Sequence, residues 1–570
     1  MKSKSKYKFI VEVSKPNLNY FAICLISSVK TKSQIFNLPT WSPGSYLIRD
    51  YSTHIHDFSV TDLDGKSLSF EKINLSAWKI YSNDKIIKIF YKVYAFEQTV
   101  RTNFLDSEYG FINPPSTFLY PENNLHASVE LEFQLNVNFN FIYTSLQKSK
   151  DTFLAQDFDT LYDSPIQLSN RKSIPFIASN CKHEIIIEAD TLPSFQKKLI
   201  RDLIKIIEFE IDLMKTNPNK KYLFILHLNP GSYGGLEHAQ SSVNTFDPHK
   251  LHDEFEYQKL LGLLAHEYFH LWNAKRIRPF ELNPFDYQNP NLTNELWIVE
   301  GITSFYDNYI MMRTHFFTPE DYLHEISLDY NRLENSEGEL SMSLEESSFT
   351  AWNKFYKQSA NSHNTGISYY VKGSILVLCM YIFILKNSAA KHDFTEILIA
   401  LYDSYYEKEN RGFTKDEFFE TAKKITGLDL KKEFDKYLSK PIRIPINDYL
   451  GFLGIKRIST QTKNDLGFDL ESKSGKYYIS KIYKQLTVKD TDINLQDELI
   501  SINNIRYESD KVEFIKARLK KNSVIKLILS RRGKIIQRNL KMNTFKNHKI
   551  VLEKTEDINI LKLRKAFFDE

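Results

Sequence analysis

The chain is best understood outward from Lys259-Leu260-Leu261-Gly262-Leu263-Leu264-Ala265-His266-Glu267-Tyr268-Phe269-His270, an apolar segment that closes with two histidines. Side chains four residues apart lie on one face of a helix, so both imidazoles can reach one small cation. Zn²⁺ suits such a pair, and Glu267 would lie where a water on the metal sits. Histidines in so apolar a helix need polar partners, and a metal supplies one. The motif therefore favours a zinc site over a core helix that carries two histidines by chance.

Length and composition place the chain among multidomain globular proteins. It has 570 residues, too many for one hydrophobic core, with 42% hydrophobic and 26% charged residues. A net charge of +4 points neither to nucleic acid nor to a membrane surface. Three widely spaced cysteines, Cys24, Cys181 and Cys379, argue against a disulfide framework. We therefore expect a soluble protein of a reducing compartment, the cytoplasm.

The amino terminus does not have the pattern of a signal peptide. Its apolar run, Tyr20 to Val29, comes late, lacks a small-residue cleavage pattern and is closed by Lys30 and Lys32. We interpret this run as a strand. No stretch of 18 apolar residues is apparent, so no membrane span is predicted.

The pattern of elements predicts a multidomain α+β protein. Residues 1–165 alternate as strands do and form an N-terminal all-β domain, in which Trp41 to Tyr46 is expected to be a structural turn. Residues 166–445 combine strands, a Gly-rich loop at 229–238, the metal helix and long helices near 296–313, 368–386 and 394–406. A sheet followed by helices, with the metal helix at the junction, is the organisation of a thermolysin-like catalytic domain.

Strand character returns beyond Leu450, and residues 446–548 are predicted to form a small β module that could bind an extended peptide at a sheet edge. Its expected elements include a helix over 511–520 and a hairpin at Arg532-Gly533. Segment 511–549 holds 13 Lys/Arg against one Glu but few aromatics, so a solvated face is favoured over a nucleic-acid surface. Residues 549–570 form a C-terminal tail with a short amphipathic helix.

A catalytic zinc needs a third protein ligand and one open position. Glu300, in Trp297-Ile298-Val299-Glu300-Gly301, is the best candidate, because a carboxylate among such apolar neighbours is costly without a cation. Glu295 is a competitor, although a position near the helix start suits a capping acid. Asp307 lies seven residues after Glu300 on the same face. It is either a second-sphere acceptor for a ligand imidazole or a surface acid.

Three further groups would complete the chemistry. Glu267 is the candidate general base, passing a proton from water to the leaving nitrogen. Tyr369 or Tyr370 could donate a hydroxyl to the oxyanion, and residue chemistry alone does not choose between them. After Gly234-Gly235, Glu237 could bind a free α-amine; alternatively, it is a surface acid beside a glycine turn.

Taken together, these segments resemble the glycyl aminopeptidase family, gluzincin metallopeptidases with a C-terminal PDZ domain. The resemblance rests on motifs spread over most of the chain: Gly234 to His238, His266 to Pro279, Trp297 to Thr303, Tyr369 to Gly373, Trp41 to Tyr46 and Asp163 to Ile166.

The resemblance implies one Zn²⁺ per chain held by His266, His270 and Glu300, with Glu267 as general base. Likeness to the wider aminopeptidase N and leukotriene hydrolase branch selects Tyr370 as the oxyanion donor. That branch carries a Gly-x-Met-Glu-Asn loop, from which this chain departs at Leu236 and His238. The family implies peptide substrates with a free N-terminus and small first residues, Gly or Ala.

Leu466-Gly467-Phe468 resembles the carboxylate-binding loop of PDZ domains, which implies capture of a peptide C-terminus. Asp465 before the loop, and Gln496-Asp497 where a Gly-Asp pair is usual, depart from that pattern. Two alternatives to a zinc aminopeptidase remain: an endopeptidase with the same site, and a PDZ peptide-binding protein with a silent peptidase shell.

Overall fold

The computed structural model describes residues 7–29, 31–82, 86–135, 139–191, 194–460, 464–508, 523–545 and 547–569. The chain forms two compact units. Unit 1 comprises residues 1–291 and 402–412, and unit 2 comprises 292–401 and 413–570. The predicted domain borders at 165 and 445 do not coincide with the border between these units. The multidomain α+β fold with a β-rich N-terminal part is as predicted.

The N-terminal part of unit 1 is built on a seven-stranded sheet. Its order is β13-β14-β11-β1-β2-β7-β4, in which β1 pairs parallel with β11 and antiparallel with β2. Alternate residues of β1 are buried, as the period-2 pattern predicts. The strands are β1 Tyr7–Val13, β2 Tyr20–Ser28, β4 Ile55–Asp62, β7 Ile86–Tyr94, β11 Val129–Leu135, β13 Gln147–Ser149 and β14 Thr152–Ala155.

Two four-stranded sheets extend this β region. One has the order β10-β3-β6-β5 and the other β12-β15-β9-β8. The second sheet includes residues beyond position 165, because β15 pairs with β9 and β12. The strands are β3 Ser33–Asn37, β5 Phe70–Asn74, β6 Ala77–Tyr81, β8 Phe104–Leu105, β9 Tyr109–Ile112, β10 Tyr120–Pro121, β12 Phe141–Thr144 and β15 Ile166–Ser169, with helix α1 Phe158–Tyr162 before β15.

The rest of unit 1 places the metal helix against a five-stranded sheet of order β16-β17-β18-β20-β19. Helix α3 packs against β19 and β20, and α2 packs against α3. The predicted loop over 229–238 is wrong in its second half, where β19 forms the antiparallel edge strand. The elements are β16 Ile174–Ala178, β17 Cys181–Glu188, α2 Gln196–Met214, β18 Lys221–Leu228, β19 Tyr233–Glu237, β20 Ser241–Phe246 and α3 Glu254–Phe269.

Unit 2 begins with a helical region arranged around α8, most of whose residues are buried. Its elements are the π-helical turn η6 Trp297–Gly301, α4 Ile302–Arg313, α5 Pro319–Glu334, α6 Leu344–Phe349, the π-helical turn η8 Ala351–Phe355, α7 Ser362–Thr365, α8 Tyr369–Asn387, α9 Thr395–Leu401, α10 Lys415–Thr426, α11 Leu430–Ser439 and α12 Ile446–Leu450. Two of the predicted long helices are present, near 296–313 and 368–386, whereas the one predicted over 394–406 is the seven-residue α9 followed by the π-helical turn η9 Tyr402–Glu407.

One stretch of this region passes a test for membrane spans that is based on length and hydropathy. Within the described residues, Ser362–Asn387 is long and apolar enough to cross a membrane, with a mean hydropathy of 1.7 over its 18-residue window. Interspersed polar residues hide this stretch from a search for an unbroken apolar run. In the structure 83% of that window is buried by the protein itself, as in the core helix of a globular domain.

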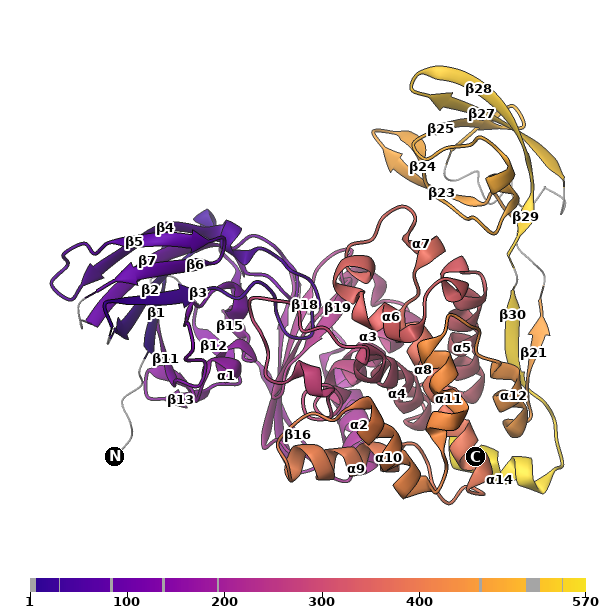
Figure 1. Cartoon of the computed structure of the whole chain (residues 1–570), viewed down its shortest axis with the longest axis horizontal. Helices are drawn as coiled ribbons and strands as arrows, with labels where there is room; N and C mark the ends of the chain where they lie inside the picture. The colour runs from indigo at the N-terminus through magenta and orange to yellow at the C-terminus, as the bar shows by residue number, and fades with distance from the viewer. Residues whose placement is uncertain are drawn as a thin grey trace. The chain divides into compact units, whose positions relative to one another are not determined.

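The C-terminal part of unit 2 contains a β ribbon and a separate sheet of order β23-β24-β25-β27-β28, with β26 paired to β25 (Figure 1). The ribbon, β21 with β30, packs on α5. The predicted hairpin is β27–β28, and the predicted helix over 511–520 lies outside the described residues. The elements are β21 Ile455–Ser459, β22 Asn464–Asp465, β23 Phe468–Lys473, β24 Lys476–Ile482, β25 Glu498–Ile502, β26 Ile505–Arg506, β27 Val524–Arg531, β28 Lys534–Lys541, β29 Asn543–Thr544, β30 His548–Leu552 and α14 Ile558–Phe568.

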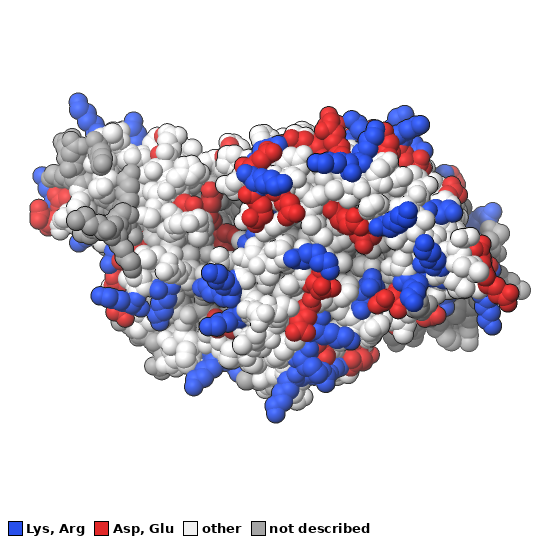
Figure 2. Space-filling model, turned by 90° about the horizontal axis from the view of Figure 1, so that it is seen from below, with Lys and Arg blue, Asp and Glu red and all other residues white. Residues whose placement is uncertain are grey.

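Charges of both signs are interspersed on the face shown in Figure 2, where lysines and arginines alternate with acidic residues. This mixture agrees with the near-neutral composition of the chain. The described part of this face therefore has no single-sign field that would attract a polyanion.

Candidate metal centre

The two histidines of the motif lie at the carboxyl end of α3. Asp253 caps the start of the helix by accepting a hydrogen bond from the Glu256 amide, and His270 is the C-cap after Phe269. The Nε2 atoms of His266 and His270 are 3.1 Å apart. Two nitrogens bound to one tetrahedral zinc at about 2.05 Å each lie about 3.3 Å apart. The imidazole pair therefore has the geometry to share one ion.

The protonation of His270 is fixed by the turn that follows the helix. Its Nδ1 lies 2.8 Å from the carbonyl oxygen of Asn273, so Nδ1–H donates and Nε2 keeps its lone pair for a metal. Asp307 was a candidate for this acceptor role, but for His270 the backbone of Asn273 fills it. The sequence offers no signal for a main-chain acceptor, because any residue can provide one.

Two buried carboxylates converge on the same place in unit 1. One ligand atom each from Glu237, Glu267 and His270 lies within 4.8 Å of the others. Glu237 and Glu267 are each 5% exposed. Two buried carboxylates side by side repel each other and lose hydration, so a cation nearby stabilises them. A metal on the imidazoles, or a substrate ammonium group, supplies that charge.

Gly235 has a packing role that the sequence did not reveal. A Cβ atom at Gly235 would lie 2.0 Å from Oε1 of Glu267, so only glycine lets β19 run this close to α3. The same residue accepts a hydrogen bond from Arg101 through its carbonyl oxygen, at 3.0 Å. Gly234 has a φ of 146°, a backbone conformation that favours glycine. The glycine pair therefore positions the general-base candidate as well as the edge strand.

The turn Trp41 to Tyr46, expected to be merely structural, reaches this site. Gly44 has a φ of 83°, and a Cβ atom there would lie 2.5 Å from both carboxylate oxygens of Glu237. The turn is anchored by Trp41, whose indole donates to the carbonyl oxygen of Asp286 at 2.8 Å. The glycine within a Ser-Pro-Gly turn could have suggested a close approach, but its partner, distant in sequence, could not have been predicted.

Asp163 connects the strand of Glu237 to the turn after α3. Its carboxylate lies 2.6 Å from Lys275 Nζ and 3.2 Å from His238 Nδ1, and it accepts from the Ala239 amide at 2.8 Å. Burial by itself raises the pKa of Asp163, but the charge of Lys275 and the contact with His238 outweigh it, so the net pKa is well below its usual range. His238 and Ala239 directly follow Glu237, and Lys275 donates its amide to the His270 carbonyl oxygen. Asp163 therefore ties both flanks of the site together.

The remaining predicted ligand, Glu300, lies in unit 2 on the π-helical turn η6. Its side chain is 3% exposed. π-helical turns are rare and occur often at functional sites. The competitor Glu295 accepts a hydrogen bond from the indole of Trp297 at 2.6 Å. Gly301 fits tightly against α8, since a Cβ atom there would lie 2.7 Å from the Cα of Gly373.

Tyr370 and Tyr369 begin α8 and differ in their surroundings. Tyr369 is fully buried, whereas Tyr370 is half-buried. Burial, and next the negative charge of Glu300, raise the pKa of Tyr370 well above its usual value. Tyr370 is therefore a neutral hydrogen-bond donor near the carboxylate of Glu300.

Asp307, on α4, acts electrostatically on Asp329. Burial raises the pKa of Asp329 most, the negative charge of Asp307 raises it further, and the result is a pKa of about 7.

The predicted carboxylate loop of the C-terminal sheet carries an internal hydrogen bond. Leu466 and Phe468 are buried, and Gly467 has a φ of 80°. The Gly467 amide, however, donates to the carboxylate of Asp465 at 2.7 Å, so this N–H already has an anionic acceptor.

Asp497, which stands where PDZ domains usually have the Asp of a Gly-Asp pair, forms an ion pair within the sheet. Its side chain is 1% exposed, and its closest contact with Arg531 is 2.8 Å. Asp497 thus has a structural role in the sheet.

Comparisons with known proteins show which family and fold this chain resembles. The family model described as M61 glycyl aminopeptidase matches residues 259–376, and the peptidase M61 N-terminal domain matches residues 8–170. A crystal structure of an aminopeptidase N family protein from Idiomarina loihiensis has a TM-score of 0.91 at 23% identity, covering 98% of this chain and 100% of that one, which shows the fold.

More distant structures match only part of the chain. An M1 zinc metallopeptidase from Deinococcus radiodurans has a TM-score of 0.48 at 11% identity, covering 77% of this chain and 94% of that one. Yeast LTA4 hydrolase in complex with bestatin has a TM-score of 0.48 at 14% identity, covering 77% and 68%. No curated protein matches the chain significantly.

Proposed function

This chain belongs to the M61 peptidase family and is a metallopeptidase hydrolase, and we propose a more specific activity for it. In this proposal the protein is a zinc-dependent aminopeptidase that removes small N-terminal residues, Gly or Ala, from peptides. The observation that carries the proposal is the convergence of Glu237 and Glu267 on the imidazole of His270. An aminopeptidase needs both a proton-transfer group and an amine-binding group at the metal, and these two carboxylates supply them.

In this proposal His266, His270 and Glu300 hold one zinc ion, which when bound polarises the scissile carbonyl and lowers the pKa of water. The orientation of His270 by Asn273, and the burial of Glu300, support these assignments. Asp307 remains a candidate outer partner only for His266. Glu295, occupied by the Trp297 indole, suits a structural role better than a ligand role.

The chain's own groups would move the protons and hold the oxyanion. Glu267 accepts a proton at its carboxylate and returns it to the leaving nitrogen. The hydroxyl of Tyr370, kept protonated by its raised pKa, donates to the carbonyl oxygen as negative charge develops there. This step is worth about a hundredfold to a thousandfold in kcat in comparable oxyanion sites.

Glu237 would bind the free amine of the substrate and thereby set the cleavage position. It ends an edge strand, is buried, and lies against Gly44 on one side. The turn at Gly44 therefore closes one side of this carboxylate. This supports cleavage after the first residue. Leu236 and His238 stand where the Gly-x-Met-Glu-Asn loop of related aminopeptidases has Met and Asn. Both substitutions leave the carboxylate of Glu237 in place.

The C-terminal part is proposed to be a PDZ-like domain, residues 446–548, following an N-terminal β domain over 1–165 and a catalytic domain over 166–445, with a tail over 549–570. The strand arrangement β23 to β28 supports a PDZ-like sheet. Binding of a peptide C-terminus at Leu466 to Phe468 remains a proposal, which the Asp465 contact weakens. A cytoplasmic location is proposed because Cys24, Cys181 and Cys379 are free thiols.

Hydrolysis of Gly- and Ala-anilides tests the proposal, with metal analysis of the purified protein and a chelator control. We expect activity that is lost on chelation and restored by Zn²⁺. N-acetylated substrates should be resistant, because the amine that Glu237 binds is removed. Undiminished cleavage of acetylated peptides would instead establish an endopeptidase, and peptide binding without any turnover would establish a silent peptidase shell.

A further inference from the structure

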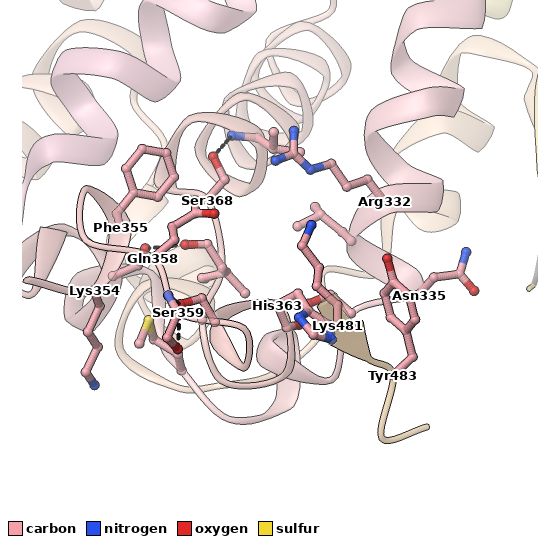
Figure 3. A pocket seen from close by; sticks show the side chains of 18 residues that line it. Arg332, Asn335, Lys354, Phe355, Gln358, Ser359, His363, Ser368, Lys481 and Tyr483 are labelled. Carbon is pink, nitrogen blue, oxygen red and sulfur yellow. Dashed lines mark hydrogen bonds between the residues drawn. The ribbon is translucent and has the colours of Figure 1, made fainter. Parts of the chain in front are cut away.

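A cationic cavity lies within unit 2, separate from the residues assigned to the metal centre. It has a volume of about 290 Å³ and lies between the end of α5, the segment from Met342 to Val371 and the end of β24 (Figure 3). Its described lining includes two cations, Arg332 and Lys481, together with Lys354, whose ammonium group contacts Glu346 at 3.0 Å, and it includes no aspartate or glutamate. A concave site lined by cations without acids selects for a negatively charged ligand.

Two of these cations extend toward one space from different parts of the fold. Figure 3 shows the guanidinium group of Arg332, from α5, and the ammonium group of Lys481, from β24, pointing into the same opening. Among the described residues no carboxylate oxygen lies within 4.0 Å of the Arg332 guanidinium nitrogens, although its charge acts on Asp329, one turn earlier on α5. Lys481 has only a loose contact with Asp469, at 3.5 Å between side chains that are 46% and 42% exposed. Neither charge is held in a close ion pair, so an added anion competes only with Asp329 and Asp469.

The walls of the cavity are held by hydrogen bonds between α7 and the end of β24. His363 Nε2 lies 2.9 Å from the Ile482 carbonyl oxygen, and Asn364 donates to the same oxygen at 2.8 Å. In return, the Lys484 amide donates to the Asn364 side chain at 3.1 Å. The backbone that follows Lys481 is thus held against α7, and these hydrogen bonds join two walls of the cavity.

The cavity also adjoins the proposed oxyanion donor. Phe355 and Val371 line it, and the Phe355 ring stacks on Tyr370 with centroids 5.7 Å apart. Ser368, which caps α8 by accepting from the Val371 amide, lies in the same wall. The first turn of α8 therefore adds a favourable partial positive charge.

We propose that this cavity binds a carboxylate group of the peptide, through Arg332 and Lys481, while the amine of the peptide is bound elsewhere. The proposal rests on the proposed function in one respect: it assumes that the ligand is a peptide, whose negative groups are carboxylates. Arginine pairs with a carboxylate through two parallel hydrogen bonds, and the lysine adds a second charge. The enzyme would then prefer short peptides that carry a carboxylate over equally long uncharged ones.

Peptide length and charge provide the test. The four substrates are Gly-Ala-Ala-Ala with a free C-terminus, its C-terminal amide, and Gly-Ala-Asp-Ala and Gly-Ala-Asn-Ala as amides. The first pair measures the terminal carboxylate and the second pair a side-chain carboxylate. We expect a lower KM for at least one carboxylate peptide, by about tenfold, since two partly exposed ion pairs contribute about threefold each. The difference should shrink in high salt.

Arg332→Gln and Lys481→Gln, singly and together, should raise KM for the carboxylate peptide toward that of its amide and leave kcat unchanged. Lys423→Gln is the matched control, because Lys423 is an exposed lysine on α10 whose partner is Asp429 and which does not line the cavity. Far-ultraviolet circular dichroism verifies folding of each variant. Equal KM values for all four substrates, or a preference that survives the double substitution, would overturn the proposal.

Binding measurements separate this proposal from the proposed function. Calorimetry with the full-length Glu267→Gln protein and added Zn²⁺ follows the same peptides without cleavage. Tighter binding of a carboxylate peptide, lost on adding Arg332→Gln and Lys481→Gln, supports the cavity even if the wild type fails to cleave Gly-anilide. Conversely, cleavage of Gly-anilide with no carboxylate preference in binding would leave the aminopeptidase assignment intact and reject the cavity.

Discussion

Replacing Asp163 by asparagine should destabilise the region that holds Glu237. The carboxylate contacts Lys275 Nζ at 2.6 Å, His238 Nδ1 at 3.2 Å and the Ala239 amide at 2.8 Å. The side chain of Lys275 is only 9% exposed, so Asp163→Asn leaves a buried ammonium group without its counter-ion. Breaking a buried ion pair costs about 3–5 kcal/mol. Because the side chain of Asp163 is 23% exposed, we expect the lower end, about 3 kcal/mol.

Urea unfolding at pH 7, compared with Lys275→Met and the double variant, measures this coupling. The double variant should be more stable than Asp163→Asn alone, because the unpaired charge is removed as well. The same substitution should raise KM for Gly-anilide, since His238 and Ala239 adjoin Glu237. A double variant no more stable than Asp163→Asn, or a change in unfolding free energy below 1 kcal/mol for the single variant, would refute the ion-pair argument.

The pH dependence follows from the direction of the pKa shift. Because the pKa of Asp163 is lower in the folded than in the unfolded protein, its ionised form contributes stability above the unfolded pKa of about 4. That contribution is lost as the pH falls from about 4 toward the folded pKa. The stability difference between wild type and Asp163→Asn should therefore be constant between pH 5 and 7 and shrink below pH 4. An undiminished difference at pH 3 would contradict this assignment.

Three other perturbations test the metal centre directly. Glu267→Gln should retain zinc by metal analysis while losing nearly all turnover, and full activity would remove the proposed base. Gly235→Ala should lower kcat by about a hundredfold, because the added Cβ would lie 2.0 Å from Glu267 Oε1 and displace that carboxylate. Gly451→Ala is the control and should leave kcat unchanged, because no atom lies within 4 Å of the added Cβ. Tyr370→Phe should lower kcat by about a hundredfold to a thousandfold with little change in KM, and unaltered kcat would reassign the oxyanion donor.

The sequence was sufficient wherever the physics is local. A four-residue spacing on a helix places His266 and His270 together whatever surrounds them, because helical geometry alone aligns their side chains. Alternating strands such as Tyr7–Val13 were equally predictable, since one buried face imposes a period of two. The long helices were predictable because their apolar content matches burial against a sheet or other helices.

The tertiary structure alone decided which distant residues share a site. The contact of Gly44 with Glu237, the link from Asp163 to Lys275 and the approach of Gly235 to Glu267 join residues separated by up to 193 positions. Such contacts depend on how sheets and helices pack, and no local pattern encodes them. The cationic cavity has the same origin: Arg332 and Lys481 are unremarkable surface residues in sequence, and only the docking of β24 on α7 brings their charges to one space.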